Sequence, residues 1–188
     1  STITGCTALN NTPNGISAGS ANTITGCTAY ANTGTGINTA GGSTVLNCTA
    51  SSNDGSGISA GSASTVVDCT TGANDVDGIV CGSRCVIRGN MCQTNGFAGN
   101  GAGVRATGGD NRIEGNNCID ADLGIVLLGA GNIMLKNTCS GNGINYDIFA
   151  GNRYGPIINL TAFNPATVSG NAGASTVGST DPWANFAY

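Results

Sequence analysis

The chain has 188 residues, of which only 6 are Lys or Arg and 10 are Asp or Glu, giving a net charge of −4. Its length fits one domain, and its few basic residues form no cluster that would neutralise phosphates, which excludes nucleic acid as a partner. No apolar run reaches the roughly 18 residues of a membrane span, so we expect no membrane contact.

A tandem repeat begins at the first residues and sets the fold. The segments TITGCTA, TITGCTA, TVLNCTA and TVVDCTT place cysteines 21 residues apart, at Cys6, Cys27, Cys48 and Cys69. Ten residues after each cysteine stands an isoleucine: Ile16, Ile37, Ile58 and Ile79. A repeat this short predicts one coil of a solenoid per copy, because each copy buries its apolar face only by stacking on its neighbours.

Strands rather than helices form each coil. Alternation within TIT and TVL is typical of strands, Gly, Asn and Asp clusters are typical of turns, and 32 glycines oppose helical repeats. A left-handed β-helix has a hexapeptide rhythm that the period of 21 does not fit, and crossovers of the usual hand give a right-handed coil. The prediction is an all-β, right-handed parallel β-helix of about seven coils, roughly 35 Å long.

The repeat continues with insertions at Cys92, Cys118 and Cys139, spaced 23, 26 and 21 residues apart, while Val104 and Ile125 continue the isoleucine column. We expect all seven cysteines to occupy one equivalent position, as a ladder of buried, reduced thiols that act as small hydrophobes. Spacings this wide, in a chain without histidine, do not suit a metal site. Cys81 and Cys85 break the repeat. Two alternatives stay open for them: a disulfide, or one buried thiol and one turn thiol.

Two further columns accompany the cysteines. Asparagines recur five residues after them, at Asn11, Asn32, Asn53 and Asn74. Stacked Asn side chains satisfy turn backbone groups, so we expect a structural ladder. The threonines that follow each cysteine are expected to point outward: Thr7, Thr28, Thr49 and Thr70. A second threonine column is incomplete, since Thr4 and Thr25 give way to Leu46 and Val67.

The runs VIRGNMCQTNG (86–96), NRIEGNNCIDADLGIVL (111–127) and NIMLKNTCSGN (132–142) share an inward aliphatic residue, a Gly-Asn turn and a second inward residue. In this pattern the chain resembles the right-handed parallel β-helix proteins of the pectate-lyase-like superfamily, over about 140 residues. The resemblance implies the fold. It also implies a possible lyase or hydrolase activity on acidic polysaccharides, in which outward carboxylates act, sometimes with calcium, beside an Arg or Lys base.

The candidate catalytic residues under that interpretation are Arg88, Arg105, Glu114, Asp120 and Asp122. Arg88 and Glu114 both stand four residues before a cysteine, so we expect them to be vertical neighbours on the outer face, where an ion pair explains them equally well. Asp120 and Asp122 fall in a bend, where turn chemistry is the simpler explanation, as it is for Asp54, Asp75 and Asp77.

The functional expectation is a non-catalytic scaffold or carbohydrate-contacting module of a secreted or cell-surface protein, with a polysaccharide as partner and no cofactor. The start carries no charged-then-apolar leader, which fits a mature secreted chain or a fragment of one. One alternative is a polysaccharide lyase or glycoside hydrolase, the only case in which calcium is expected. A second is an ice-binding or crystalline-surface-binding protein.

We expect residues 1–144 to form the coils and residues 145–188 to close them. The closing segment holds seven of the nine aromatic residues: Tyr146, Phe149, Tyr154, Phe163, Trp183, Phe186 and Tyr188. It is predicted to fold over the last coil as an aromatic cap anchored by Trp183 and Phe186, because open strand edges need cover. The first residue lies inside a repeat, which predicts that the first coil packs on another copy or on a preceding part of a longer protein.

Overall fold

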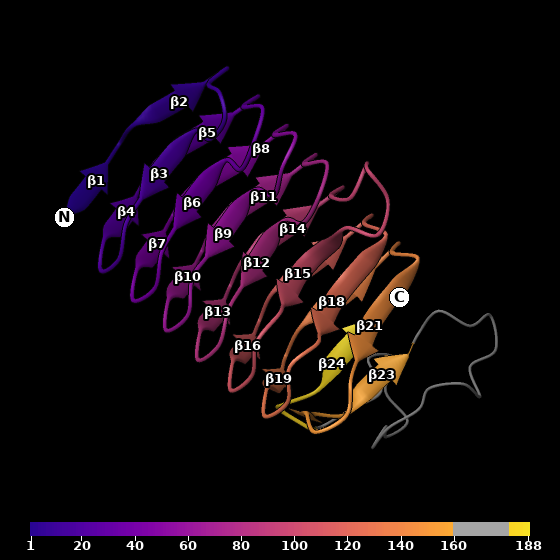
Figure 1. The fold of residues 1–188 in the computed structure, drawn as a ribbon. Helices are drawn as coiled ribbons and strands as arrows, with labels where there is room; N and C mark the ends of the chain where they lie inside the picture. Colours follow the sequence, from indigo (N-terminus) through magenta and orange to yellow (C-terminus); the bar gives the residue numbers. More distant parts are fainter. Residues whose placement is uncertain (160–180) are drawn as a thin grey trace.

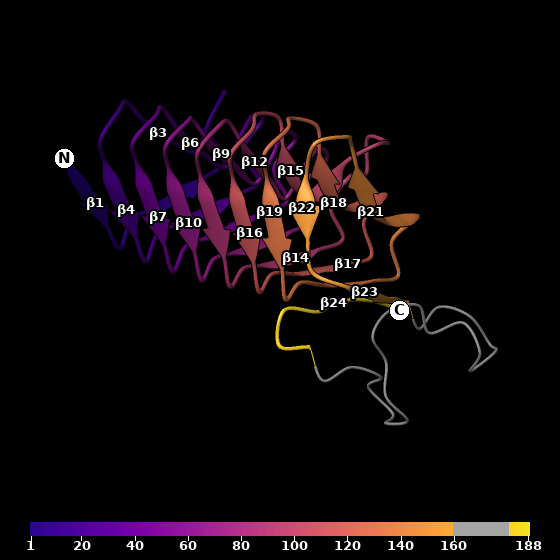
Figure 2. The same ribbon diagram turned by 90° about the horizontal axis from the view of Figure 1, so that it is seen from below.

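The computed structural model describes residues 1–159 and 181–188. The described residues form a rod of stacked coils (Figures 1 and 2), and three parallel sheets run its length. Each coil adds one short strand to each sheet in turn, so sequence neighbours lie on different sheets. Strand partners are about one repeat apart. This confirms the parallel β-solenoid with a period near 21 residues and about seven turns.

The three sheets are named A, B and C here. Sheet A contains β1 (Thr2–Thr4), β4 (Thr23–Thr25), β7 (Thr44–Leu46), β10 (Thr65–Val67), β13 (Val86–Arg88), β16 (Arg112–Glu114), β19 (Ile133–Leu135) and β22 (Arg153–Tyr154). Sheet B contains β2 (Thr7–Leu9), β5 (Thr28–Tyr30), β8 (Thr49–Ser51), β11 (Thr70–Gly72), β14 (Met91–Gln93), β17 (Asn117–Ile119), β20 (Thr138–Ser140), β24 (Asn185–Ala187) and β23 (Ile157–Asn159). Sheet C contains β3 (Ile16–Ala18), β6 (Ile37–Thr39), β9 (Ile58–Ala60), β12 (Ile79–Cys81), β15 (Ala102–Ala106), β18 (Leu123–Leu127) and β21 (Ile144–Ile148).

Each sheet sends one column of side chains into the core. The predicted column on sheet C is confirmed, because its members pair in register and are buried: Ile16, Ile37, Ile58, Ile79, Val104 and Ile125. Sheet A adds a second aliphatic column that includes Ile24, Val45 and Ile87. Burying each such side chain stabilises the fold by about 1.5 to 3 kcal/mol before the entropy cost of ordering it.

The prediction of one seven-membered cysteine ladder is wrong, since the sulfurs divide into two columns. The first four cysteines stand at the corner between sheets A and B, and there the next coil holds Asn90, whose Oδ1 accepts from the Cys69 amide at 2.9 Å. Cys92 instead pairs with Thr71 inside sheet B and continues to Cys118 and Cys139. An interval of 23 residues is the period plus two, and a shift of two residues keeps a side chain on the same face of a strand.

The thiols of the first column do more than fill space. The Cys48 Sγ accepts from the Cys27 amide at 3.4 Å and donates to the Leu46 carbonyl at 3.3 Å. All nine cysteines are free, and Cys6 alone among them is exposed. Cys81 and Cys85 are both buried and unlinked, so neither of the two alternatives for them holds as stated.

Every corner of the coil repeats one device: a residue with positive φ, then a side chain that accepts a hydrogen bond from the preceding coil. Between sheets B and C the predicted asparagine ladder is confirmed, with Asn32 donating its amide N–H and its Nδ2 to the Asn53 Oδ1 at 3.1 and 2.9 Å. Asn95 extends it to a fifth rung. Between sheets C and A, a third ladder of Ser, Cys and Asn includes Asn111 and Asn132.

The C-terminal strand closes the rod differently from the prediction. It does fold back, because β24 inserts between β20 and β23 in sheet B. Its buried members are Asn185 and Ala187, whereas Trp183 is 47% exposed and stacks only under Lys136, 4.6 Å from the ring centroid. Trp183 and Phe186 are therefore not the predicted anchors. Phe186 pairs with outward-facing Thr138, and Phe163 lies outside the described residues.

Candidate functional site

The regular corner between sheets B and C is lengthened in one coil. The isoleucine column spans 21 residues from Ile58 to Ile79 but 25 from Ile79 to Val104. The extra residues form a loop at 96–101, named the 96–101 loop here, between the asparagine ladder and β15. Because the coils on either side keep their register, the added residues have to leave the wall of the rod.

Two carboxylates hold this loop in place. The Asp77 Oδ1 accepts from the Ala102 amide at 2.8 Å and from the Arg105 Nε at 2.9 Å, and the Arg105 guanidinium also donates to the Asn100 carbonyl at 2.5 Å. On the other side, the Gly101 amide donates to the Asp122 Oδ2 at 3.1 Å. The loop is thus fixed at its C-terminal end by groups from the coil before it and the coil after it.

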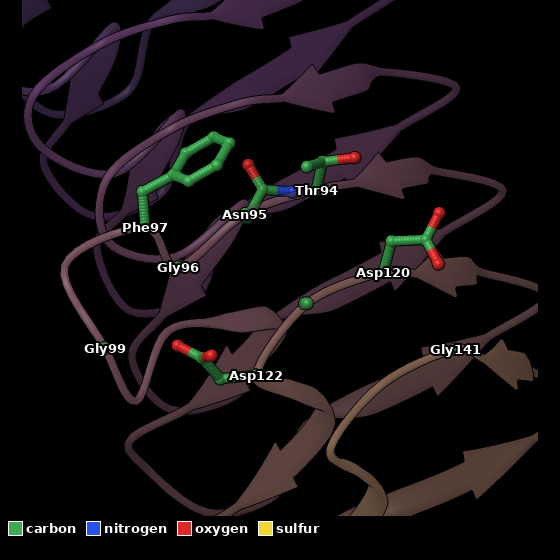
Figure 3. Close-up of a pocket in the computed structure, with 9 residues that line it drawn as sticks. Thr94, Asn95, Gly96, Phe97, Gly99, Asp120, Asp122 and Gly141 are labelled. Carbon is green, nitrogen blue, oxygen red and sulfur yellow. The ribbon is translucent and has the colours of Figure 1, made fainter.

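A groove of about 390 Å³ opens beside the loop (Figure 3). It is lined by Thr94, Asn95, Gly96, Phe97, Gly99, Asp120, Ala121, Asp122 and Gly141. The Phe97 side chain is 67% exposed, the most exposed large apolar side chain among the described residues. The groove therefore combines an aromatic ring with hydroxyl, amide and carboxylate groups.

Asp120 reaches the groove because of its place in the corner. It has a φ of 55°, the left-handed conformation that Asp and Asn tolerate better than most residues. Its carboxylate leans along the axis over Gly141, where a Cβ would collide with the Asp120 Oδ1. Asp68 and Asp110 lean over Gly89 and Gly131 in the same way at the other two corners. Turn chemistry thus accounts for the position of Asp120, while its carboxylate stays exposed.

The five candidate catalytic residues occupy three separate parts of the rod. Arg88 and Glu114 are register partners at the ends of β13 and β16 on sheet A, as predicted. Arg105 lies on sheet C, engaged by Asp77, while Asp120 and Asp122 line the groove at the corner between sheets B and C. Only the last two share a site.

Glu114 is held by neighbours other than Arg88. Its carboxylate pairs with Arg112 at 2.8 Å and with Lys136 at 3.5 Å. The hydrogen bond from Arg112 holds the pKa of Glu114 below its ordinary value, so this carboxylate is ionised at neutral pH. A general acid needs the opposite shift.

The other acidic residues divide between surface and interior. Asp54 and Asp75 share a repeat position, as their amides donate to the carbonyls of Asn32 and Asn53 at 3.0 Å. Asp77 does not line an outer edge, since it is 4% exposed and holds the 96–101 loop. Within residues 1–159 and 181–188, no group of three or more His, Cys, Asp or Glu side chains is placed to hold a metal ion.

Phe97 was absent from the sequence-based candidates. The signal was available in the interval of 25 residues, together with the run FAGNG at 97–101, since an insertion in a regular solenoid has to project. The predicted outward threonine row is confirmed over four coils by the pairs Thr7 with Thr28 and Thr49 with Thr70. Met91 then takes its place. The described part of the chain has no helix long and apolar enough to span a membrane.

Comparisons with solved structures agree with this architecture. The pectate lyase Pel9A is 20% identical with a TM-score of 0.57, and the match covers 81% of this chain and 48% of Pel9A. The A-module of the Azotobacter vinelandii mannuronan C-5 epimerase AlgE4 is 20% identical with a TM-score of 0.63, covering 78% of this chain and 53% of the module. The corresponding module of AlgE6 is 16% identical with a TM-score of 0.58, covering 82% and 58%.

The chain thus spans about half the length of these structures, and at such identities they show the fold alone. No curated protein matches the sequence. The family described as the right-handed β-helix region matches residues 1–117. With its three parallel sheets, its corner ladders and this match, the chain belongs to the right-handed β-helix family.

Proposed function

We propose that this chain is a non-catalytic, carbohydrate-contacting module of a secreted or cell-surface protein. The observation that carries the proposal is the exposed ring of Phe97 beside the groove that holds Asp120 and Asp122. An aromatic face gives a sugar ring an apolar contact, while carboxylate, amide and hydroxyl groups accept and donate hydrogen bonds to its hydroxyls. The similarity to enzymes named for pectate and mannuronan favours a carbohydrate over other ligands.

The rigidity of the loop supports binding without a large ordering cost. Its backbone is tied to the wall of the rod, since the Gly96 amide donates to the Asn74 carbonyl and the Ala98 amide to the Asp75 carbonyl, both at 2.9 Å. A ring fixed in this way loses little conformational entropy on contact with a sugar.

The non-catalytic part of the proposal rests on where the charges lie. Arg105, which would act as the base or stabilise charge, is committed to Asp77 and to the Asn100 carbonyl. Arg88 and Glu114 are on sheet A, away from the groove at the corner between sheets B and C. The proposal includes no cofactor, and calcium belongs to the lyase alternative.

The test is retention of the protein on immobilised polysaccharides in affinity electrophoresis, with and without a chelator. We expect retention on at least one polysaccharide, unchanged by the chelator and lost in Phe97→Ala. The matched control is Phe149→Ala, an aromatic 51% exposed but not lining the groove. Equal retention of Phe97→Ala and the wild type would reject the site, and release of unsaturated or shortened products would establish the enzyme alternative.

A further inference from the structure

A second hollow of about 360 Å³ lies on the outer face of sheet B, lined by Ser51, Gly72, Ala73, Gln93 and Thr94. Thr94 also lines the groove beside Phe97, so the two hollows adjoin at that residue. They follow the same corner of the rod from coil to coil.

The combined trough runs parallel to the axis of the rod. Ser51, Gly72 and Gln93 are register partners on β8, β11 and β14, and the same column continues to Ile119 and Ser140, which immediately precede Asp120 and Gly141. Five successive coils therefore line it, a length of about 19 Å at the inter-strand spacing of roughly 4.8 Å. A hollow of this shape suits an extended chain better than a compact ligand.

Gly72 creates the second hollow. The same outward column holds Leu9 and Tyr30 in the first two coils, and both side chains are about half exposed, at 52% and 47%. At Gly72 the column has no side chain, and an added Cβ would meet only the Gln93 carbonyl oxygen, at 3.5 Å. The wall of sheet B is therefore notched at that coil.

The charges along the trough discriminate between ligands. Its charged lining side chains, within the described residues, are the carboxylates of Asp120 and Asp122, and none of the residues around either hollow is Lys or Arg. The nearest guanidinium identified beside the loop, that of Arg105, is engaged by Asp77 and the Asn100 carbonyl. A uronate sugar would thus meet like charge with no free cation to offset it.

We infer that this trough takes an uncharged, linear polysaccharide lying along the axis of the rod, with Phe97 at one end of its path and the notch at Gly72 at the other. The inference rests on the proposed function and gives its site a substrate class. It separates this chain from its structural neighbours, whose names refer to the acidic polymers pectate and mannuronan.

The experiment is calorimetric titration with cello-, xylo- and manno-oligosaccharides from two to six sugars, beside oligogalacturonates and protonated glucosamine oligomers of the same lengths. We expect a neutral series to bind with affinity that rises with length and changes little with salt, since it involves no ion pairing. Tighter binding of the acidic or the cationic series than of any neutral series would overturn the inference. The proposed function would survive that result if the binding still required Phe97.

A second variant tests the path. Gly72→Tyr copies the residue at Tyr30 and fills the notch, so we expect the six-sugar ligand to lose at least ten-fold in affinity while the two-sugar ligand is unaffected. Leu9→Tyr is the matched control on the same column, and the melting temperature of both variants checks folding. Full affinity of a folded Gly72→Tyr for the long ligand would overturn the path along the axis. Absence of binding across the whole panel would overturn both this inference and the proposed function.

Discussion

The corner between sheets A and B is built with thiols in the first coils and with asparagines in the later ones. In the thiol part, the Cys27 amide donates to the Cys48 Sγ at 3.4 Å, and that sulfur donates to the Ile24 carbonyl at 3.6 Å. In the asparagine part, the Asn90 amide donates to the Asn116 Oδ1 at 3.0 Å, and the Asn90 Nδ2 donates to the Val66 carbonyl at 3.1 Å. The two parts place the same bonds at the same positions.

The difference teaches what this corner requires, which is one acceptor and one donor on a small side chain. Asparagine adds a bond that sulfur lacks, from the Nδ2 of one rung to the Oδ1 of the next, at 2.9 Å between Asn90 and Asn116. We therefore expect the asparagine part to be the more strongly held of the two.

The largest test removes the last rung. Asn137 donates its amide and its Nδ2 to the Asn185 Oδ1 at 3.0 and 3.1 Å. Deleting residues 181–188 should cost on the order of 5 kcal/mol, at about 1 kcal/mol for each of several lost hydrogen bonds, and should broaden the melting transition. Calorimetry measures this, with Tyr188→Ala as the control that keeps the strand. An unchanged transition would show that β24 does not close the rod.

The next test asks whether the core is independent of the corner. Ile58 lies beside the thiol part and Ile125 beside the asparagine part, and both are fully buried. Each change to Ala should lower the free energy of unfolding by about 2 to 5 kcal/mol, the range for a truncated core aliphatic. Ser59→Ala, on the outer face of β9, should change it by less than about 0.5 kcal/mol. Unequal losses at the two isoleucines would mean that corner and core are coupled.

The comparison itself is tested by removing one rung from each part. Asn116→Ala leaves the Asn90 amide and the Ile87 carbonyl without their partners, at about 1 to 3 kcal/mol for each buried group. Cys48→Ala removes weaker sulfur bonds, and we expect a loss near 1 kcal/mol. Urea denaturation ranks the two. If Cys48→Ala proves the more damaging, packing of the sulfur rather than hydrogen bonding governs the thiol part.

Thiol accessibility gives a further check on the two sulfur columns. Cys6 is exposed and the other eight cysteines are buried. Burial also raises the pKa of the Cys27 thiol, which disfavours the reactive thiolate. A thiol reagent without denaturant should label one cysteine quickly, and mass spectrometry should place the label at Cys6. Rapid labelling of several cysteines in the folded protein would contradict the inward assignment of both columns.

The smallest effect is expected from Glu114. Its pKa is lowered in the folded state by Arg112, so the stabilisation is present at neutral pH and is lost as the pH falls below the ordinary value through the lowered one. Because Arg112 and Lys136 are 46% and 43% exposed, the effect should stay below about 1 kcal/mol. Urea denaturation at neutral and acidic pH should show a smaller pH dependence in Glu114→Gln than in the wild type. Identical curves would mean that the ion pairs add nothing.

The regular coils could be read from the sequence because every contact in them repeats. The isoleucine column, the asparagine ladder and the outward threonines each recur at 21 residues, and in a solenoid a fixed interval means direct contact between neighbours. The vertical pairing of Arg88 with Glu114 followed from the same argument. The assignment failed at Cys92, where the residue type recurred and the position did not.

The sequence by itself determined the fold, the period, the inward columns and the first asparagine ladder, because these depend on local strand alternation and on stacking at a constant interval. Only the tertiary structure decided the split of the sulfur columns, the insertion of β24 between β20 and β23, and the groove beneath Phe97. These features depend on where an insertion projects and on which coil a distant strand joins. Neither is fixed by the repeat, since an insertion leaves the register of the neighbouring coils intact while it moves its own side chains out of the column.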